Sequence, residues 1–415
     1  MKIIRFFTFH IIFLFSFYAN AQSVLKNGIW RATILVDKGQ KELPFSLEVS
    51  EKEKGKQIMY ILNGTERLLL QDLKQKNDSI FVKMHIFDGA ILAKIEGNKM
   101  HGVYRKYDAK DPQYSLPFQA EAGVNYRFKP LTNNKPTANI SGRWAVTFRG
   151  ENAADTTQAV GIFEQKAKGH LTGTFLTTTG DYRFLEGYVE NNTLKMSAFD
   201  GSHAFLFTAD IDGNKITNGH FWAGTTGHET WTATANPNAA LPDAESLTFL
   251  KKGYERLDFS FPNLEGKKIS LSDKQFKDKV VIVQMLGSWC PNCMDETAFL
   301  TDWYAKQDAN KVAIIGLGFE RKKEFSYAKQ RLEIMKKRFN IRYPLLVAGI
   351  ANKDSAAAVL PALQQVLAFP TTIIIDKKGK VRYIHTGFSG QGTGQEYEKF
   401  VADFRKKIAE LSNEK

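Results

Sequence analysis

The chain has 415 residues, of which 43% are hydrophobic and 24% are charged, a globular composition that excludes a disordered or fibrous protein. At roughly 150 residues a domain, this length predicts two or three domains. The formal net charge is +13, but acidic residues are interspersed with the basic ones, which is typical of a solvated surface rather than of a nucleic-acid-binding one.

Residues 1–21 have the three-part layout of a secretory signal peptide. Lys2 and Arg5 precede an almost wholly apolar run over residues 6–18, and Ala19-Asn20-Ala21 then supplies small residues for cleavage. The run is too short to cross a bilayer, which takes about 20 residues; an uncleaved membrane anchor is the alternative. We therefore expect a soluble protein in the periplasm or another extracytoplasmic compartment, where nucleic acid is not a partner.

Two stretches rich in proline and asparagine, residues 129–138 and 235–243, divide the remaining chain into three pieces, of which the first two resemble one another. Three landmarks recur in the same order: Gly28-Ile29-Trp30 as Gly142-Arg143-Trp144, Phe87-Asp88-Gly89 as Phe199-Asp200-Gly201, and Gly97-Asn98-Lys99 as Gly213-Asn214-Lys215. The nearly constant offset predicts an internal duplication. Alternating apolar and polar residues, with frequent Asn-Gly and Asp-Gly turns, predict short antiparallel strands. We expect an all-β region of two small β-sandwich or β-barrel repeats, residues 22–128 and 139–234.

No catalytic or metal site is predicted in this β region. It holds six of the eight histidines, none with the spacing of metal ligands: His85, His101, His170, His203, His220 and His228. They are expected as isolated surface or core residues. Three tryptophans, Trp144, Trp222 and Trp231, are expected as core anchors of a barrel, and the alternative is that they line a ligand groove.

Residues 250–413 change to strands that alternate with helices. Val280–Met285 is a continuous apolar run rich in β-branched residues, which predicts a strand buried on both faces. Further strands are expected over residues 311–317, 371–375 and 381–385, and helices over residues 294–306, 325–339, 356–367 and 396–411. This alternation predicts an α/β sandwich around a mixed sheet.

The only two cysteines, Cys290 and Cys293, lie between the first of these strands and its helix. Backbone N–H groups and the dipole at a helix N-terminus favour an anion, so the pKa of Cys290 should fall below that of a free cysteine. Pro291 is compatible with the first turn of a helix. A disulfide that closes so small a loop constrains the unfolded chain little, which favours a chemical role over a structural one. Cys290 would attack a substrate disulfide, and Cys293 would resolve the mixed disulfide.

Other uses of a Cys-x-x-Cys pair do not match the neighbouring residues. Haem attachment requires histidine after the second cysteine, and that position is Met294. Structural zinc requires a second pair of ligands, and His385 is the only histidine in residues 250–413. The sequence therefore predicts neither a metal nor a cofactor.

Around these cysteines, residues 250–413 resemble the thioredoxin-fold proteins of the exported TlpA/ResA group, with the peroxiredoxin-like branch as a relative. The resemblance rests on Trp289-Cys290-Pro291-Asn292-Cys293, on the apolar strand before it and on Phe369-Pro370-Thr371-Thr372. It also covers residues 258–271, which look like the family's extra N-terminal hairpin. The resemblance implies that Cys290 and Cys293 are catalytic, with Trp289, Pro291 and Thr371 in support. It also implies a cis Pro370 facing the disulfide, where exposed backbone would pair with substrate; an ordinary trans turn is the alternative.

Two departures from thioredoxin bear on proton transfer. Gln284 stands where thioredoxin has a buried aspartate, and it cannot exchange a proton near neutral pH. Glu296 matches the acidic residue of the TlpA/ResA pattern, where a partly buried carboxylate with a raised pKa would shuttle the proton of the inner thiol. A helix-stabilising surface glutamate is the alternative. Ala298 replaces the proline usual in the family, and Asp295 is expected to be solvated.

The leading hypothesis is an exported thiol–disulfide oxidoreductase that reduces or shuffles disulfides in other exported proteins. The resemblance implies a membrane or exported thiol as its electron donor. A thiol peroxidase of the peroxiredoxin-like branch is the second hypothesis, although that chemistry usually uses a threonine near a lone cysteine. In the third, the β-repeat region is a binding module for an unknown partner and the redox domain is subordinate.

Overall fold

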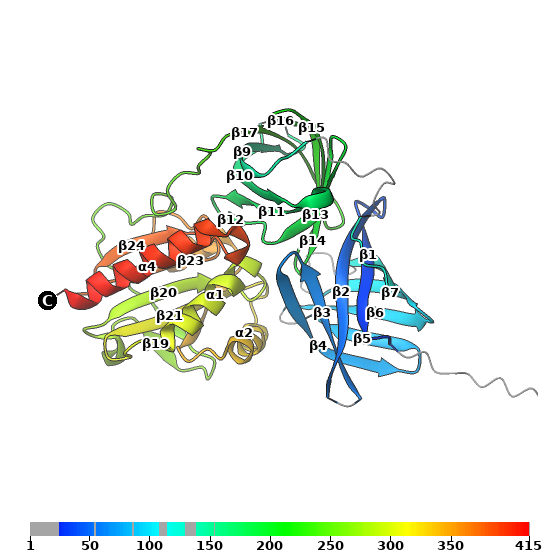
Figure 1. The fold of residues 1–415 in the computed structure, drawn as a ribbon. Coiled ribbons are helices and arrows are strands. Elements are labelled where there is room, and N and C mark those ends of the chain that lie inside the picture. The colour runs from blue at the N-terminus through cyan, green and yellow to red at the C-terminus, as the bar shows by residue number, and fades with distance from the viewer. Residues whose placement is uncertain are drawn as a thin grey trace, which may run out of the picture.

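The computed structural model describes residues 25–53, 55–84, 87–107, 114–128, 138–152 and 154–414. The predicted signal peptide, His85 and residues 129–137 lie outside the described residues. Two β-rich units, blue to cyan and green, stand beside an α/β domain that runs from yellow to red (Figure 1). Within the described ranges, every helix is too short or too polar to span a bilayer.

The first β unit is a closed antiparallel barrel in which each strand pairs with the next and the last returns to the first. Its strands are β1 (Gly28–Val36), β2 (Lys41–Glu53), β3 (Lys56–Asn63), β4 (Glu66–Lys76), β5 (Ser79–Lys83), β6 (Gly89–Glu96), β7 (Lys99–Lys106) and β8 (Ser115–Ala122). Phe45, Leu47 and Val49 of β2 are buried and alternate with the more exposed Ser46, Glu48 and Ser50, which confirms the predicted period of two. Side chains such as Trp30 and Phe118 fill the interior.

The second β unit is a nine-stranded antiparallel sheet that closes where its first edge strand, β10, pairs with β11, the strand next to the short edge strand β12. Its strands are β9 (Gly142–Arg149), β10 (Thr156–Gln165), β11 (His170–Thr177), β12 (Gly180–Asp181), β13 (Leu185–Glu190), β14 (Thr193–Phe199), β15 (Ala204–Asp212), β16 (Lys215–Ala223) and β17 (Gly227–Ala235), with a 3₁₀ turn η1 (Ala167–Gly169). Phe148, Phe175, Phe207 and Trp231 form an aromatic core. The sheet closes because its apolar face must be covered, and its own strands cover it.

The landmarks of the predicted duplication have the same local structure in both β units. The indole N–H of Trp30 donates to the carbonyl of Lys26, and that of Trp144 donates to the carbonyl of Ile140, each at 2.9 Å and four residues back. The glycine that opens the first strand has φ 115° at Gly28 and φ 116° at Gly142. The all-β region therefore consists of two related barrel-like units, as the sequence predicts.

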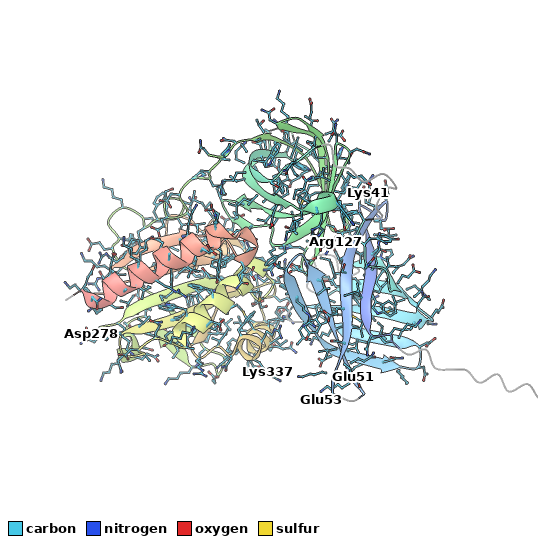
Figure 2. The ribbon with its side chains drawn as sticks, in the orientation of Figure 1. Lys41, Glu51, Glu53, Arg127, Asp278 and Lys337 are labelled. Carbon is cyan, nitrogen blue, oxygen red and sulfur yellow. A yellow bond between two sulfur atoms is a disulfide. The ribbon has the colours of Figure 1, made fainter. Side chains whose placement is uncertain are left out.

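A buried arginine joins the two β units (Figure 2). Arg127 follows β8 and donates to the carbonyl of Leu62 at 2.7 Å in the first unit and to the carboxylate of Glu186 at 2.9 Å in the second. The two units also meet through Phe45 and Phe199, whose ring centroids are 4.6 Å apart. The contact is continuous with the core of the first unit.

We expect Arg127→Met to lower the free energy of unfolding by roughly 3 kcal/mol, because it removes the buried guanidinium that pairs with the partly buried carboxylate of Glu186. Urea unfolding followed by circular dichroism measures the loss. Arg67→Met is the control, since Arg67 pairs with Glu48 at the surface of the first unit, where an ion pair adds little to stability. Equal losses in the two variants would contradict a special role for Arg127.

The α/β domain is built on a five-stranded mixed sheet in the order β22-β21-β20-β23-β24. The strands β20 (Val280–Leu286), β21 (Val312–Glu320) and β22 (Leu345–Ile350) are parallel. β23 (Thr371–Ile375) runs antiparallel to them, and β24 (Val381–Thr386) pairs antiparallel with β23 and so runs in the direction of β20. A hairpin of β18 (Ser260–Pro262) and β19 (Lys268–Ser270) lies within the expected N-terminal hairpin. Every residue of β20 is buried, because helices and loops cover both faces of the sheet.

Four α-helices and two 3₁₀ turns complete this domain: α1 (Pro291–Tyr304), α2 (Phe325–Phe339), α3 (Lys353–Val359), α4 (Gln395–Asn413), η2 (Lys274–Phe276) and η3 (Gln391–Thr393). Side chains of α1, α2 and α4 pack on one face of the sheet, and α3 packs on the other with the segment before β20. The helix expected over residues 356–367 is wrong in extent. It begins earlier, where Asn352 caps it, and ends at Val359, because Pro361 supplies no backbone N–H to continue it.

Candidate active site

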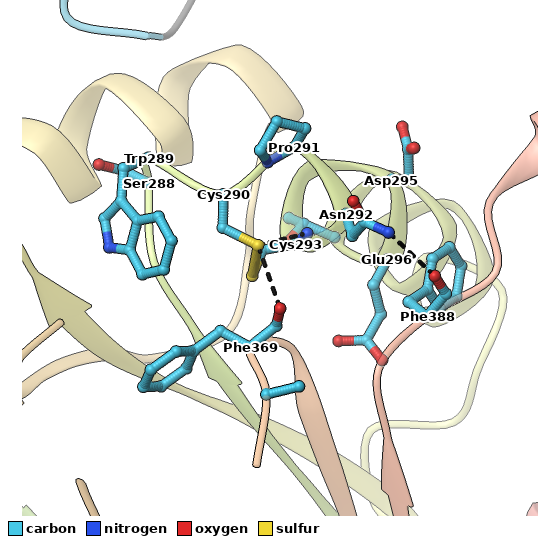
Figure 3. Close-up of a disulfide and its surroundings, with 12 residues drawn as sticks. Ser288, Trp289, Cys290, Pro291, Asn292, Cys293, Asp295, Glu296, Phe369 and Phe388 are labelled. Carbon is cyan, nitrogen blue, oxygen red and sulfur yellow. Dashed lines mark hydrogen bonds between the residues drawn. A yellow bond between two sulfur atoms is a disulfide. The ribbon is translucent and has the colours of Figure 1, made fainter. Parts of the chain in front are cut away.

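The two cysteines lie where β20 passes into α1, at the centre of the sheet. Pro291 is the first residue of α1, and Cys290 is its N-cap, whose sulfur accepts a hydrogen bond from the backbone N–H of Cys293 at 3.2 Å. Cys290 and Cys293 form a disulfide with their Cα atoms 5.2 Å apart (Figure 3). The helix N-terminus is therefore aimed at Cys290 Sγ, as the sequence pattern predicts.

The outer and inner sulfurs differ in access. Cys290 is 5% exposed and Cys293 is fully buried, so of the two cysteines only Cys290 has any exposed surface. Cys290 Sγ lies 3.3 Å from the carbonyl oxygen of Phe369, and the Phe369–Pro370 peptide bond is cis, as the resemblance implied. Thr371 follows in β23 and donates its hydroxyl to the carbonyl of Ala368 at 2.8 Å. The structure thus brings the cysteine pair and this loop together.

Trp289 forms one wall beside Cys290. Its indole N–H donates to the carbonyl of Phe319 at 2.9 Å, and its ring meets Phe369 edge to face at 5.8 Å. The guanidinium of Arg321 lies 4.7 Å from the centroid of the same ring. Trp289 is partly exposed, so its ring offers an aromatic surface next to the accessible sulfur.

Glu296 lies in α1 one turn after Cys293 and is 1% exposed, which excludes the surface alternative. Its carboxylate accepts hydrogen bonds from Gln284 Nε2 at 2.8 Å and from the hydroxyl of Thr372 at 2.7 Å. Burial raises the pKa of Glu296 to about 7, and the two hydrogen bonds oppose part of that rise. A carboxyl with this pKa can gain or lose a proton near neutral pH.

Glu320, at the end of β21, is a site residue that the sequence reasoning missed. It is 1% exposed and accepts two hydrogen bonds from Ser288, from the backbone N–H and from the hydroxyl, each at 2.8 Å. These bonds hold the loop that presents Trp289 and Cys290. The available signal was a carboxylate that ends an otherwise apolar buried strand.

The second β unit reaches the cysteine motif, which the sequence did not predict. The amide of Asn292 donates to the carbonyls of Asp181 and Phe388, both at 3.2 Å, and the hydroxyl of Ser202 donates to the carbonyl of Trp289 at 3.2 Å.

Asp295 is not solvated as expected: it is half-buried and paired with Arg183. The expectation was wrong because Asp295 lies on a helix face that is covered only when the β unit is docked.

Four histidines in the second β unit that were expected to be isolated have polar partners, and one of them, His203, lies 3.2 Å from the carboxylate of Asp200. His170 lies 3.0 Å from the carboxylate of Glu186, and the ring nitrogens of His220 and His228 are 3.0 Å apart. Across the residues with defined positions, no group of three or more His, Cys, Asp or Glu side chains could hold a metal ion.

The family model that matches this chain aligns with residues of the α/β domain. Residues 253–384 match the AhpC/TSA family model. The chain is 28% identical over 140 residues to the thioredoxin-like protein YneN of Bacillus subtilis, covering 33% of this chain and 73% of that protein. It is 29% identical over 149 residues to the thiol-disulfide oxidoreductase ResA of Bacillus thuringiensis, covering 36% and 76%. A solved thioredoxin domain of a thiol-disulfide oxidoreductase from Bacteroides vulgatus is 24% identical and covers 37% of this chain and 99% of that one, with a TM-score of 0.28.

Proposed function

We propose that this chain, whose C-terminal domain is a thioredoxin-like thiol–disulfide oxidoreductase, is exported and reduces disulfides in other exported proteins. The observation that carries the proposal is the Cys290–Cys293 disulfide at the N-terminus of α1, with only Cys290 accessible. The signal-peptide pattern of residues 1–21 supports export. The similarity to a protein named thiol-disulfide oxidoreductase ResA supports the class of reaction.

The reaction has two exchange steps. The Cys290 thiolate attacks one sulfur of a client disulfide, which forms a mixed disulfide and releases the other client sulfur as a thiolate. The Cys293 thiolate then attacks Cys290 Sγ and breaks the mixed disulfide. The client disulfide is reduced to two thiols, and the Cys290–Cys293 dithiol is oxidised to a disulfide, a transfer of two electrons. A membrane-bound or exported dithiol then reduces this disulfide by the same exchange, without a dissolved cofactor.

Glu296 supports the second step as an acid–base group. The inner thiol of Cys293 must lose its proton before it can attack, and Cys293 is sealed from solvent. Glu296 is the buried carboxyl one turn along the same helix, and its pKa of about 7 suits it to accept that proton and return it. Gln284 holds Glu296 by a hydrogen bond but cannot titrate.

We expect the full chain to accelerate the reduction of insulin by dithiothreitol and to consume hydrogen peroxide no faster than dithiothreitol alone. The reason is that Cys290 is paired with a resolving cysteine within the same helix turn, which suits disulfide exchange. Insulin turbidity and peroxide consumption, measured on the same preparation, check the prediction. Peroxide consumption that depends on the protein, without insulin reduction, would favour the thiol peroxidase hypothesis instead.

A further inference from the structure

Arg183 is a buried cation at the meeting point of the three parts of the chain. It lies between β12 and β13, and its side chain is 7% exposed. Its guanidinium pairs with three carboxylates, one from each part: Glu66 of the first β unit, Asp200 of the second and Asp295 of α1. Arg183 therefore holds together charges that lie far apart in the sequence.

The same guanidinium touches the redox motif itself. Arg183 donates a hydrogen bond to the carbonyl of Pro291 at 3.2 Å, and Pro291 stands between the two cysteines. Asp295, its ion-pair partner, lies two residues after Cys293 on α1. The side chains of Asn292 and Asp295 extend from the start of α1 in Figure 3, on the side away from Trp289. One arginine of the β region thus contacts α1 at two points.

The backbone around Arg183 is fitted closely to the α/β domain. The carboxylate of Asp181 accepts hydrogen bonds from the backbone N–H of Arg183 at 2.5 Å and of Gly390 at 2.6 Å. At Gly180, a Cβ atom would lie 2.3 Å from the side-chain nitrogen of Asn292, so only glycine fits there. This packing fixes the arginine relative to α1.

The local charge balance makes the cation important. Glu66, Asp200 and Asp295 surround one guanidinium, and the carboxyl of Asp181 lies nearby. Burial raises the pKa of Glu66, and the charge of Arg183 opposes that rise. Without the cation, uncompensated negative charge would stand beside the N-terminus of α1, where a thiolate must form during the reaction.

We propose that Arg183 is a positioning residue of the redox site, through which the second β unit orients the start of α1 and sets the reduction equilibrium of Cys290 and Cys293. This inference rests on the proposed function of that cysteine pair, and it gives the β region a part in the chemistry. Residues of the β region complete the surroundings of the Cys290–Cys293 pair when that region is docked against α1.

The test measures the equilibrium of the full-length protein with glutathione, together with the rate at which iodoacetamide alkylates reduced Cys290 at pH 7. In Arg183→Met the remaining carboxylates disfavour the Cys290 thiolate. We therefore expect the glutathione equilibrium to shift about tenfold toward the protein disulfide, which makes the reduction potential of the cysteine pair more negative by about 30 mV. Alkylation should slow by a similar factor. Arg183→Lys, which keeps the charge but not the planar fork, should recover part of both changes.

Asp295→Asn provides the opposite change and leaves Arg183 in place. It removes one negative charge from α1, so the equilibrium should shift several-fold toward the dithiol and alkylation should become faster. Arg127→Met is the matched control: Arg127 is as buried as Arg183 and also joins the β units, but the hydrogen bonds that it makes go to β-region residues. Its equilibrium should stay within about twofold of the wild type.

Folded Arg183→Met protein with a wild-type glutathione equilibrium would overturn the proposal. If that variant does not fold, Asp295→Asn decides, and an unchanged equilibrium there overturns it as well. The glutathione equilibrium requires no client protein. A chain that fails to reduce insulin but shows these opposite shifts would therefore reject the proposed function and leave the role of Arg183 standing.

Discussion

Cys290→Ser should lower insulin reduction to the rate of dithiothreitol alone, whereas Cys293→Ser should accumulate a mixed disulfide with the client. A serine hydroxyl is not ionised near neutral pH and cannot form a disulfide, so loss of the accessible sulfur removes the first exchange step. Loss of the buried sulfur leaves that step intact and removes the second. The two substitutions therefore separate the roles of the two cysteines.

The measurement is insulin turbidity for both variants, followed by non-reducing electrophoresis of pre-reduced Cys293→Ser protein mixed with insulin in the absence of dithiothreitol. The adduct should disappear when dithiothreitol is added in excess. Thr301→Ser, a conservative change on the same helix, should behave as the wild type. It serves as the control for the effect of a substitution in α1 outside the cysteine pair. If Cys290→Ser formed the adduct and Cys293→Ser did not, the assignment of attacking and resolving cysteines would be reversed.

Glu296→Gln should change how the stability of the oxidised protein depends on pH. Burial raises the pKa of Glu296 from 4.5 to about 7. Folding therefore favours the protonated carboxyl. Its contribution to the free energy of unfolding is fully present below about pH 4.5 and is lost as pH rises through about 7. The difference corresponds to about 3 kcal/mol, at about 1.4 kcal/mol for each pH unit. Glutamine keeps the neutral shape, so the variant should gain stability over the wild type by up to this amount from pH 4 to pH 8.

Urea unfolding of both proteins at pH 4, 6 and 8 measures this difference. Asp302→Asn, an exposed carboxylate on the same helix, should show no comparable trend. If Glu296 also moves the proton of Cys293, the pH dependence of insulin reduction should lose its transition near pH 7 in Glu296→Gln. Parallel pH profiles in wild type and variant would reject the proton-transfer role, and parallel stability curves would reject the raised pKa.

The redox motif could be predicted from the sequence because its signals are local in the chain. An apolar β-branched run, two cysteines separated by two residues and a proline at the first helical position are enough to place Cys290 at a strand-to-helix junction. The internal duplication could be predicted for the same reason, since a Gly-x-Trp segment and an Asp-Gly turn each involve only a few consecutive residues. The observed strands of both β units agree with them.

The errors and omissions have a common cause. Asp295 looked solvated because helical periodicity says nothing of a second domain that covers the helix. Glu320 was missed because its partner, Ser288, lies 32 residues away. The helix near residue 360 was drawn too long because its composition favours helix, whereas a single proline ends it.

By itself, the sequence determined that this protein carries one cysteine pair at a helix N-terminus, on a mixed sheet preceded by two related β units. Only the tertiary structure decided that the β units close on themselves and dock against α1, so that Arg183 meets carboxylates from residues 66, 200 and 295. Local patterns depend on neighbours within a few turns of the chain. A buried ion-pair cluster depends on which surfaces pack together, and that is settled only when the whole chain folds.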